Sequence, residues 1–249
     1  MSGNTDISST PSGTSRFATT HWSVVLAAGS PSSPQYERSL GALCQTYWFP
    51  LYAYLRRQGH DTHQAEDHTQ GFFTYLLEKR ALRRADPKYG KFRSFLLATL
   101  RHFLTDERDR TRAQKRGGGQ KVFSLNFETA ESQYAIEPAH HLSPEKLFER
   151  HWALTVLNRT ICRLKAESAS TNKRNLFTIL ETYLTLEEGS VPYRDVAAKL
   201  NMTEGAVKVA VHRLRKRYRE LLRDEIAQTV AAEDQVDEEI RDLFAAVAR

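Results

Sequence analysis

Apolar side chains in the first half of the chain recur three and four positions apart, which is the spacing of the buried face of an α-helix. The pattern begins near Tyr36, stops at Gly59, resumes after the good helix cap Asp61 and breaks at the loop-forming residues 86–90. A further periodic run spans residues 92–112. These runs predict three consecutive helices.

The helical period disappears in the middle of the chain and then returns. Residues 115–143 include three consecutive glycines and few periodic apolar residues, as is typical of a linker. Ser143 and Pro144 then have the pattern of a helix cap and a first-turn proline, and helical spacing continues to about Arg223 with one break at residues 189–192. No alternating strand pattern with hairpin turns occurs. We therefore predict an all-α fold of two small helical domains joined by a flexible linker.

Composition adds an extension at each end of these two domains. The first residues mix Ser, Thr, Gly and Pro, and the last residues are acidic. We expect five segments: an N-terminal extension (1–34), a first domain (35–114), the linker (115–143), a second domain containing a helix-turn-helix (144–223) and a C-terminal extension (224–249).

Charge is distributed unevenly along the chain. The formal net charge is +6, but residues 224–249 hold eight acidic side chains against two arginines, so residues 1–223 carry +12. The body is therefore strongly basic and the C-terminal end is acidic.

Several classes of protein are excluded by composition. The longest apolar runs fall far short of the ~20 residues that cross a bilayer, and the first residues are neither basic nor apolar, as a secretory signal would be. The two cysteines, Cys44 and Cys162, stand far apart, which excludes a disulfide scaffold and a Cys-based zinc module. We expect a cytoplasmic protein that does not contact a membrane.

The segment from residue 193 to residue 221 has the spacing of a helix-turn-helix. A short helix at 193–200 is followed by a turn and by Thr203, a good cap for the next helix. That helix has an apolar stripe made of Val207, Val211, Leu214, Tyr218 and Leu221. Its opposite side carries short residues and cations, which suit a major groove and its flanking phosphates: Gly205, Lys208, Val209, His212, Arg213, Lys216 and Arg219. A merely solvated basic face is the alternative, but the turn, the cap and the charge together favour a reader of duplex DNA.

A second group of cations lies toward the end of the helix predicted at 92–112. The net charge from Arg101 to Lys121 is +4, and Phe92, Phe95 and Phe103 lie beside or among these charges. Stacking aromatics together with phosphate-neutralising cations are what binding to unpaired strands requires. Core packing is the alternative for each phenylalanine, whereas phosphate contacts by the arginines do not depend on that point.

An acidic patch contrasts with this basic body. Glu66, Asp67 and Gln70 lie on the side of the second predicted helix that faces away from Phe72 and Leu76. Such a patch would repel DNA and suits a protein partner with a basic surface. A solvated helix face is the alternative.

Four stretches together resemble the extracytoplasmic-function (ECF) group of bacterial sigma factors. They are Asp-His-Thr-Gln at residues 67–70, the aromatic and basic stretch at 92–106, and two parts of the predicted helix-turn-helix at 196–208 and 211–216. The resemblance covers roughly residues 36–223. The last motif is shared with many helix-turn-helix regulators, but the ordered combination is specific.

The resemblance implies a transcription initiation factor that binds core RNA polymerase and directs it to promoters, without catalysis, cofactor or metal of its own. In that family the Asp-x-x-Gln helix docks on a coiled coil of the largest polymerase subunit, a role that falls here to Asp67 and Gln70, with Glu66 beside them. An anti-sigma factor or another regulatory protein is a further candidate partner.

The same resemblance implies which residues contact promoter DNA. The next helix recognises and melts the −10 element, and the final helix reads the −35 element as duplex. The implied residues are Arg101, His102, Asp106, Arg108, Arg110 and Arg112 for the first, and Thr203, Glu204, Lys208, His212, Arg213 and Lys216 for the second. Phe95 stands where many members have Trp, and His102 where Asn is common, so the family's −10 preference does not transfer.

Two other functions compete with this interpretation. A free-standing helix-turn-helix regulator would need a ligand or receiver domain in the N-terminal half, rather than an acidic helix beside an aromatic and basic one. An enzyme acting on nucleic acid finds little support, because His60, His63 and His68 have no accompanying acid and Cys arrangement of known metal spacing. The glycines at 117–119 also lack the Lys-Ser or Lys-Thr ending of a phosphate-binding loop.

The acidic C-terminal extension has a helical apolar pattern of its own, at Ile240, Leu243, Phe244 and Val247. A helix of this kind is suited to fold back over a basic surface or to bind a regulator. Our hypothesis from the sequence is that this extension is autoinhibitory.

Overall fold

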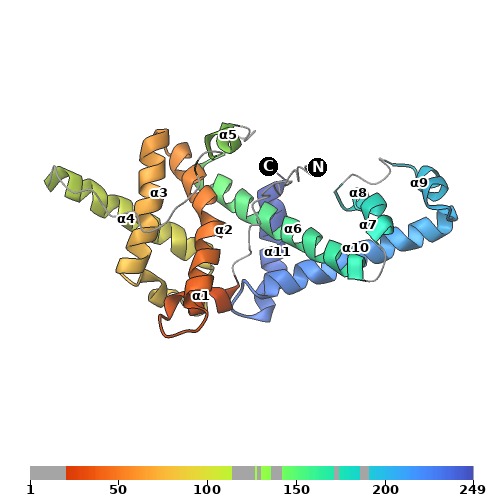
Figure 1. The fold of residues 1–249 in the computed structure, drawn as a ribbon, viewed down its shortest axis with the longest axis horizontal. Helices are drawn as coiled ribbons and strands as arrows, with labels where there is room; N and C mark the ends of the chain where they lie inside the picture. Colours follow the sequence, from red (N-terminus) through yellow and green to blue (C-terminus); the bar gives the residue numbers. More distant parts are fainter. Residues whose placement is uncertain are drawn as a thin grey trace, which may run out of the picture.

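The structure is a computed structural model that describes residues 21–113, 127, 130–135, 142–170, 174–185 and 191–248. No β-strand occurs among these residues, so the predicted all-α class is confirmed. Figure 1 shows the helices with their labels. Their bounds are α1 Trp22–Gly29, α2 Tyr36–Arg57, α3 Thr62–Glu78, α4 Phe92–Ala113, α5 Ala130–Ala135, α6 Pro144–Ser170, α7 Arg174–Leu180, α8 Thr182–Thr185, α9 Tyr193–Leu200, α10 Glu204–Ala227 and α11 Val236–Val247, with 3-10 turns η1 Ala81–Arg84, η2 Pro87–Tyr89 and η3 Glu233–Gln235.

Helix α2 is the centre of the first half of the molecule. Five consecutive residues, from Leu51 to Leu55, are all buried, which requires neighbours on every side of the helix. Helices α1, α3, α5 and α6 all contact α2. We call helices α1–α5 the N-terminal unit.

Local signals place the end of α2 and the start of α3 where the sequence predicted them. Gly59 follows α2 with a φ of 94°, a left-handed conformation that strains residues with a side chain. The Asp61 carboxylate accepts a hydrogen bond from the Gln64 amide at 2.8 Å, and the Gln64 side chain accepts one from the Asp61 amide at 3.2 Å. This reciprocal capping box satisfies amides that the first turn of α3 would otherwise leave unbonded.

Part of the expected N-terminal extension belongs to the core. Residues 1–20 lie outside the described residues, but α1 buries Trp22, Val25 and Ala28 against the N-terminal unit. These residues are three positions apart and therefore share one face of the helix. Most of the linker expected at 115–143 also lies outside the described residues, and its described parts, Phe127 and α5, pack on α2.

Helix α6 is shared between the two halves of the molecule. It begins where the sequence predicted, with the Ser143 hydroxyl accepting a hydrogen bond from the Lys146 amide at 3.3 Å. Leu147 and Phe148 are fully buried in the core around α2, whereas the distal part of α6 packs with Leu164 against Phe177 and Leu221. The hydrophobic core around α2 therefore continues across the domain boundary that was expected between residues 143 and 144.

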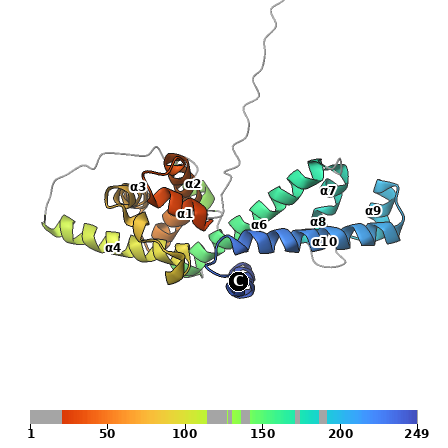
Figure 2. The ribbon, with the colours of Figure 1, turned by 90° about the horizontal axis from the view of Figure 1, so that it is seen from below.

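We call helices α7–α10 the C-terminal unit; α7, α8 and α9 lie toward the far end of α6, whereas α10 runs back along α6 (Figure 1). Helix α10 continues to Ala227, beyond the expected end near Arg223. After it, the C-terminal extension forms the predicted helix, α11, which packs on α6 and α10. Figure 2 shows α6 and α10 close together at the junction, where α11 lies, and diverging toward α7 and α9.

We expect the Phe148→Ala variant to be destabilised by ~3–5 kcal/mol, because truncating a buried phenylalanine leaves a cavity. The Phe148 ring lies 6.1 Å from the Tyr47 ring and 6.4 Å from the Tyr54 ring, so its loss affects the core around α2. Chemical denaturation measures the change. The matched control is Phe244→Ala, whose side chain is 51% exposed and whose loss we expect to cost under ~0.5 kcal/mol. Equal losses for the two variants would contradict this account of α6.

We expect His151 to make the stability of the protein depend on pH. Burial, and then the nearby charge of Arg150, lower the pKa of His151 from 6.5 to about 4. The unfolded chain therefore binds this proton more readily, so the stability is complete above the unfolded pKa and is lost as the pH falls toward the folded pKa. Between about pH 7 and about pH 5 the wild type should lose ~2 kcal/mol more than the His151→Gln variant. Denaturant unfolding at each pH measures this, and parallel curves for the two proteins would contradict it.

Candidate nucleic-acid interface

A three-residue turn joins α9 to α10 and has a fixed geometry. Asn201 ends α9 with a φ of 51°, and the Met202 amide donates a hydrogen bond to the Ala197 carbonyl at 3.0 Å. Thr203 then caps α10, because its hydroxyl accepts a hydrogen bond from the Ala206 amide at 3.2 Å. Asparagine tolerates this left-handed conformation better than most residues do. The turn therefore matches the short connection that the sequence predicted here.

Apolar packing determines which face of α10 turns outward. Val207 and Val211 are buried with Val196 and Ala197 of α9 in one small core, and Leu221 is buried further along the helix. Leu214 and Tyr218 are half-buried. The five predicted stripe residues thus face inward, and the turn and this core hold α9 against α10.

The predicted reading residues all lie on the outer face of α10 or at its cap. They are exposed to solvent: Thr203, Glu204, Lys208, His212, Arg213 and Lys216. Lys208 forms an ion pair with Glu204 at 3.0 Å and lies 5.7 Å from the centre of the Tyr193 ring. His212, Arg213 and Lys216 form no ion pair with another described residue. Among the described residues, no atom lies within 4 Å of the position that a Cβ on Gly205 would take, apart from its chain neighbours and its own helix backbone.

Helix α4 presents four of the six residues predicted for the −10 element. Arg101, His102, Asp106 and Arg108 are exposed, whereas the side chains of Arg110 and Arg112 lie outside the described residues. Arg101 is already engaged inside the molecule. Its guanidinium donates to the Glu145 carboxylate of α6 at 2.9 Å and to the Tyr54 hydroxyl at 3.3 Å. These partners raise the pKa of the Arg101 guanidinium, with the Tyr54 hydrogen bond the larger cause.

The aromatic residues of α4 point into the core. Phe92 is buried beside Trp22 and Tyr47, and Phe103 is buried beside Phe72 and Tyr75. Phe95 is half-buried and stacks on Phe92 with ring centres 5.9 Å apart. Core packing is the alternative interpretation of these phenylalanines, and the burial of Phe92 and Phe103 supports it for those two.

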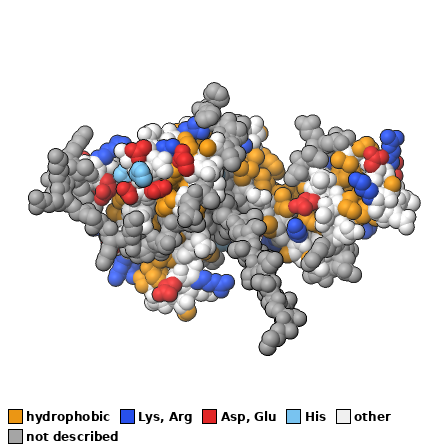
Figure 3. Space-filling model, turned by 45° about the horizontal axis from the view of Figure 1, so that its top comes forward, with side chains coloured by type: hydrophobic (Ala, Val, Ile, Leu, Met, Phe, Trp, Pro, Cys, Tyr) orange, Lys and Arg blue, Asp and Glu red, His pale blue; other side chains and the backbone are white. Residues whose placement is uncertain are grey.

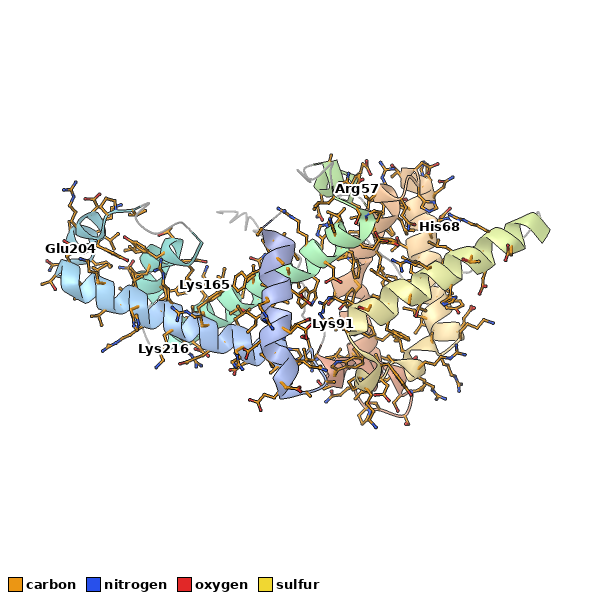
Figure 4. All side chains as sticks on the ribbon, turned by 180° about the vertical axis from the view of Figure 1, so that it is seen from behind. Arg57, His68, Lys91, Lys165, Glu204 and Lys216 are labelled. Atoms are coloured by element: carbon orange, nitrogen blue, oxygen red, sulfur yellow. The ribbon has the colours of Figure 1, made fainter. Side chains whose placement is uncertain are left out.

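The acidic patch lies on the outer side of α3. Asp67 is exposed and Glu66 and Gln70 are half-buried, while the buried residues Ala65, Thr69, Phe72, Phe73 and Leu76 face α2 and α4. Figure 3 shows acidic and histidine side chains gathered on one face of the N-terminal unit. In Figure 4, His68 marks the position of α3, at the end of the molecule opposite to Glu204 of α10.

The histidines near this patch pack against one another and against the chain. The rings of His60 and His68 meet edge to face with centres 4.9 Å apart, and His68 also meets the edge of Phe103 at 6.5 Å. Burial, and then the charge of Arg108, lower the pKa of His60; burial, and then His60, lower the pKa of His68. Both rings are therefore neutral at pH 7. Among the described residues, no group of three or more His, Cys, Asp and Glu side chains is placed to hold a metal ion.

A further basic surface, between α3 and α4, was not predicted from the sequence. Five cations lie within residues 79–88, a segment that we call the basic turn, and all five are exposed: Lys79, Arg80, Arg83, Arg84 and Lys88. Tyr89 follows them and is 89% exposed. The signal in the sequence is five cations in ten residues, beside the loop-forming residues at 86–90. Cations beside an exposed aromatic ring suit an unpaired strand better than the buried phenylalanines do.

A scan against protein-family models and searches of curated proteins and of solved structures found no match to this chain. In the part of the chain that the structure describes, no helix has both the length and the apolar character that crossing a bilayer requires.

Proposed function

We propose that the chain is a transcription initiation factor of the ECF sigma type, which binds core RNA polymerase and directs it to promoters. The observation that carries this proposal is the capped three-residue turn before α10, together with the exposed polar and basic residues that follow it. We call these residues the reading face: Thr203, Glu204, Lys208, His212, Arg213 and Lys216. The exposed cations of α4 support a further contact with an unpaired strand, and the acidic patch of α3 supports a contact with the polymerase. Polymerase supplies the chemistry, and this chain supplies position and strand capture in the cytoplasm.

The first turns of α10 suit the major groove of duplex DNA. That groove is wide enough to admit an α-helix, and basic side chains there contact guanine edges and flanking phosphates. Lys208, Arg213 and Lys216 are placed for such contacts. Glu204 is at the N-terminal end, where a carboxylate can accept a hydrogen bond from the amino group of cytosine. In this proposal α9 and α10 form the helix-turn-helix that contacts the −35 element.

The N-terminal unit suits an unpaired strand. Arg108 of α4 and the basic turn at 79–88 offer cations for phosphates, and Arg101 stays partly exposed although it pairs with Glu145. Tyr89 offers an exposed ring on which a base can stack. His102 and Asp106 are exposed on the same helix, and we propose that they contact base edges. In this proposal these residues bind and melt the −10 element.

The acidic patch on α3 suits the polymerase. Helix α3 packs mainly on α2, η1 and α4, and its outer side carries Asp67. A negative patch of this kind complements a basic protein surface and disfavours DNA. Glu66, Asp67 and Gln70 are therefore the proposed docking residues. An anti-sigma factor or another regulatory protein is a further proposed partner.

We expect the tagged protein to co-purify with bacterial core RNA polymerase and to lose it when Asp67→Ala and Gln70→Ala are combined. Removing the charge and the amide together takes away the proposed docking contacts. The amount of polymerase retained per amount of tagged protein measures the effect.

One variant controls this experiment. Glu78→Ala removes an exposed acid at the far end of α3 and should retain polymerase. Retention by the double variant would place the docking contact elsewhere. If the wild type binds genomic DNA but never polymerase, a free-standing helix-turn-helix regulator becomes the better interpretation.

We expect Arg213→Ala to weaken binding to any duplex and to reduce the salt dependence of binding. Each phosphate contact that is lost lowers the slope of log K against log salt concentration by about 1. Fluorescence anisotropy with a labelled duplex across a salt series measures both effects. Arg163→Ala is the matched control, because Arg163 is an exposed arginine on α6 away from the reading face. Equal slopes for wild type and Arg213→Ala would remove Arg213 from the interface.

A further inference from the structure

A buried cluster of charges lies where the two halves of the molecule meet. Arg93, at the start of α4, is 4% exposed, and its Nε donates to a carboxylate oxygen of Glu149 at 2.6 Å. Another nitrogen of its guanidinium pairs with Glu239 of α11, which is 1% exposed. The guanidinium also lies over the Trp152 ring of α6, 3.7 Å from its centre. One side chain of α4 therefore joins α6 and α11.

Lys91 adds a second bond between α4 and α11. Its ammonium lies 2.5 Å from a Glu239 oxygen and 2.6 Å from an Asp242 oxygen. Figure 4 shows Lys91 at this junction, beside α11. These carboxylates hold the Lys91 pKa above its ordinary value although burial acts to lower it. Two acids of the C-terminal extension thus neutralise the cations at the start of α4.

The other side of α11 is bound to the C-terminal half. Val236 and Leu243 are buried against Trp152, Leu222 and Ile226, in a small apolar core that α6, α10 and α11 share. Asp237 pairs with Arg223 of α10. Helix α11 therefore spans α4, α6 and α10.

Without other contacts, α6 would attach the C-terminal unit to the N-terminal unit only through its first turns. It has 27 residues and is ~40 Å long, but only its first turns enter the core around α2, through Leu147 and Phe148. A long helix held at its root can swing, because a small rotation there moves its far end by a large distance. The reading face of α10 is carried at that far end (Figures 1 and 2).

A third attachment connects α1 with the end of α10. The His21 ring lies 2.8 Å from the buried Glu225 carboxylate, which also pairs with Arg159 at 2.8 Å. The Trp22 amide donates a hydrogen bond to the Gln228 carbonyl at 3.0 Å. Together with the root of α6 and with α11, this gives three separate points of attachment. Three such points fix one body against another, whereas two leave a rotation about the line that joins them.

We propose that α11 is a brace that fixes α10 relative to α4, so that the chain accepts only promoters with one spacing between the −35 and −10 elements. The inference rests on the proposed function. Its residues are Glu239 and Asp242, which determine specificity without touching DNA.

The geometry of DNA makes spacing a sensitive readout. A turn of duplex has ~10 base pairs and is ~34 Å long, so one added base pair moves the second element by ~3.4 Å and turns it by about 35°. A tethered unit can follow that displacement and a braced one cannot. When the distance between the elements changes by one base pair, a braced protein should therefore lose its contacts with one of the two elements.

The position of α11 does not support the autoinhibitory hypothesis in the form in which the sequence suggested it. The extension does bind cations of the basic body, at Lys91 and Arg93. It leaves the reading face of α10 exposed, including Lys208, Arg213 and Lys216, and it leaves Asp67 of α3 exposed. A brace accounts for these contacts without requiring that any proposed binding surface be covered.

The test is a selection of promoters by polymerase with the full-length protein bound. The library randomises both elements and varies the distance between them one base pair at a time. We expect the wild type to enrich one distance, with a loss of ~tenfold or more for one base pair added or removed. The variant that combines Glu239→Gln and Asp242→Asn should recover the neighbouring distances to within a few-fold of the best one.

Two matched proteins separate the brace from a general effect of charge or folding. The variant that combines Glu233→Gln and Glu238→Gln removes two exposed acids from the same segment and should keep the single distance. A chain that ends at Gln228 lacks the brace and should behave as the Glu239 and Asp242 variant does. Circular dichroism and unfolding curves establish that each protein is folded.

A distance measurement tests the brace without polymerase. Spin labels are attached to Cys162, which is exposed on α6, and to a cysteine introduced as Glu78→Cys on α3, while Cys44 is buried. The wild-type background should give one narrow distance distribution, and loss of the Glu239 and Asp242 charges should broaden it. An equally narrow distribution in both would overturn the brace.

The selection distinguishes failure of the inference from failure of the proposed function. If wild type and the brace variant prefer the same single distance, polymerase sets the spacing and the inference is wrong. If the wild type accepts several distances equally, the inference is wrong as well. If no pair of elements is enriched at all, the proposed function fails and takes this inference with it.

Discussion

Burial of the Arg93 guanidinium is the interaction on which the arrangement of the two halves depends. A buried charge is costly unless its partners compensate for the water that it loses. Arg93 has two carboxylates and the face of Trp152 as partners, and they come from α6 and α11. The charge is therefore satisfied only where α4, α6 and α11 meet, and an incomplete junction would leave an ion without compensation. The cost of breaking this junction, more than the attraction of any single pair, holds the halves together.

This junction determines how the remaining charges are distributed. The acids of α11 pair with Lys91, Arg93 and Arg223 and thus do not neutralise the outer face of α10. The cations of α10 and of the basic turn at 79–88 stay in solvent, where their field can attract a polyanion. The acidic patch on α3 lies at the end of the molecule opposite to Glu204 of α10, so it does not oppose the attraction at α10 locally (Figure 4). The proposed contacts with duplex, unpaired strand and polymerase each use a surface that the fold leaves open.

Predictions from the sequence succeeded where a signal acts over a few residues. The stripe of α10 is confirmed because Val207, Val211 and Leu221 repeat with the helical period, and Asp61 and Thr203 cap the helices that they precede. The aromatics of α4 were ambiguous, because Phe103 lies beside cations in sequence although the helix turns them to different faces. The basic turn was not predicted, because the loop-forming residues at 86–90 indicate only that the chain reverses there. Roles in binding DNA and polymerase stay predictions, since they depend on partners.

The helical class, most helix ends and the two faces of α10 follow from the sequence alone. Periodicity, caps and breakers express interactions between residues at most four positions apart, so they can be read directly from the chain. The packing of the helices alone determines that α6 serves both halves, that α1 contacts the end of α10, and that the acidic extension pairs with Lys91 and Arg93. Arg93 and Glu239 are separated by 146 residues, and nothing local indicates that they meet. Their pairing depends on which surfaces pack together, because buried area and the desolvation of charge are properties of the assembled fold.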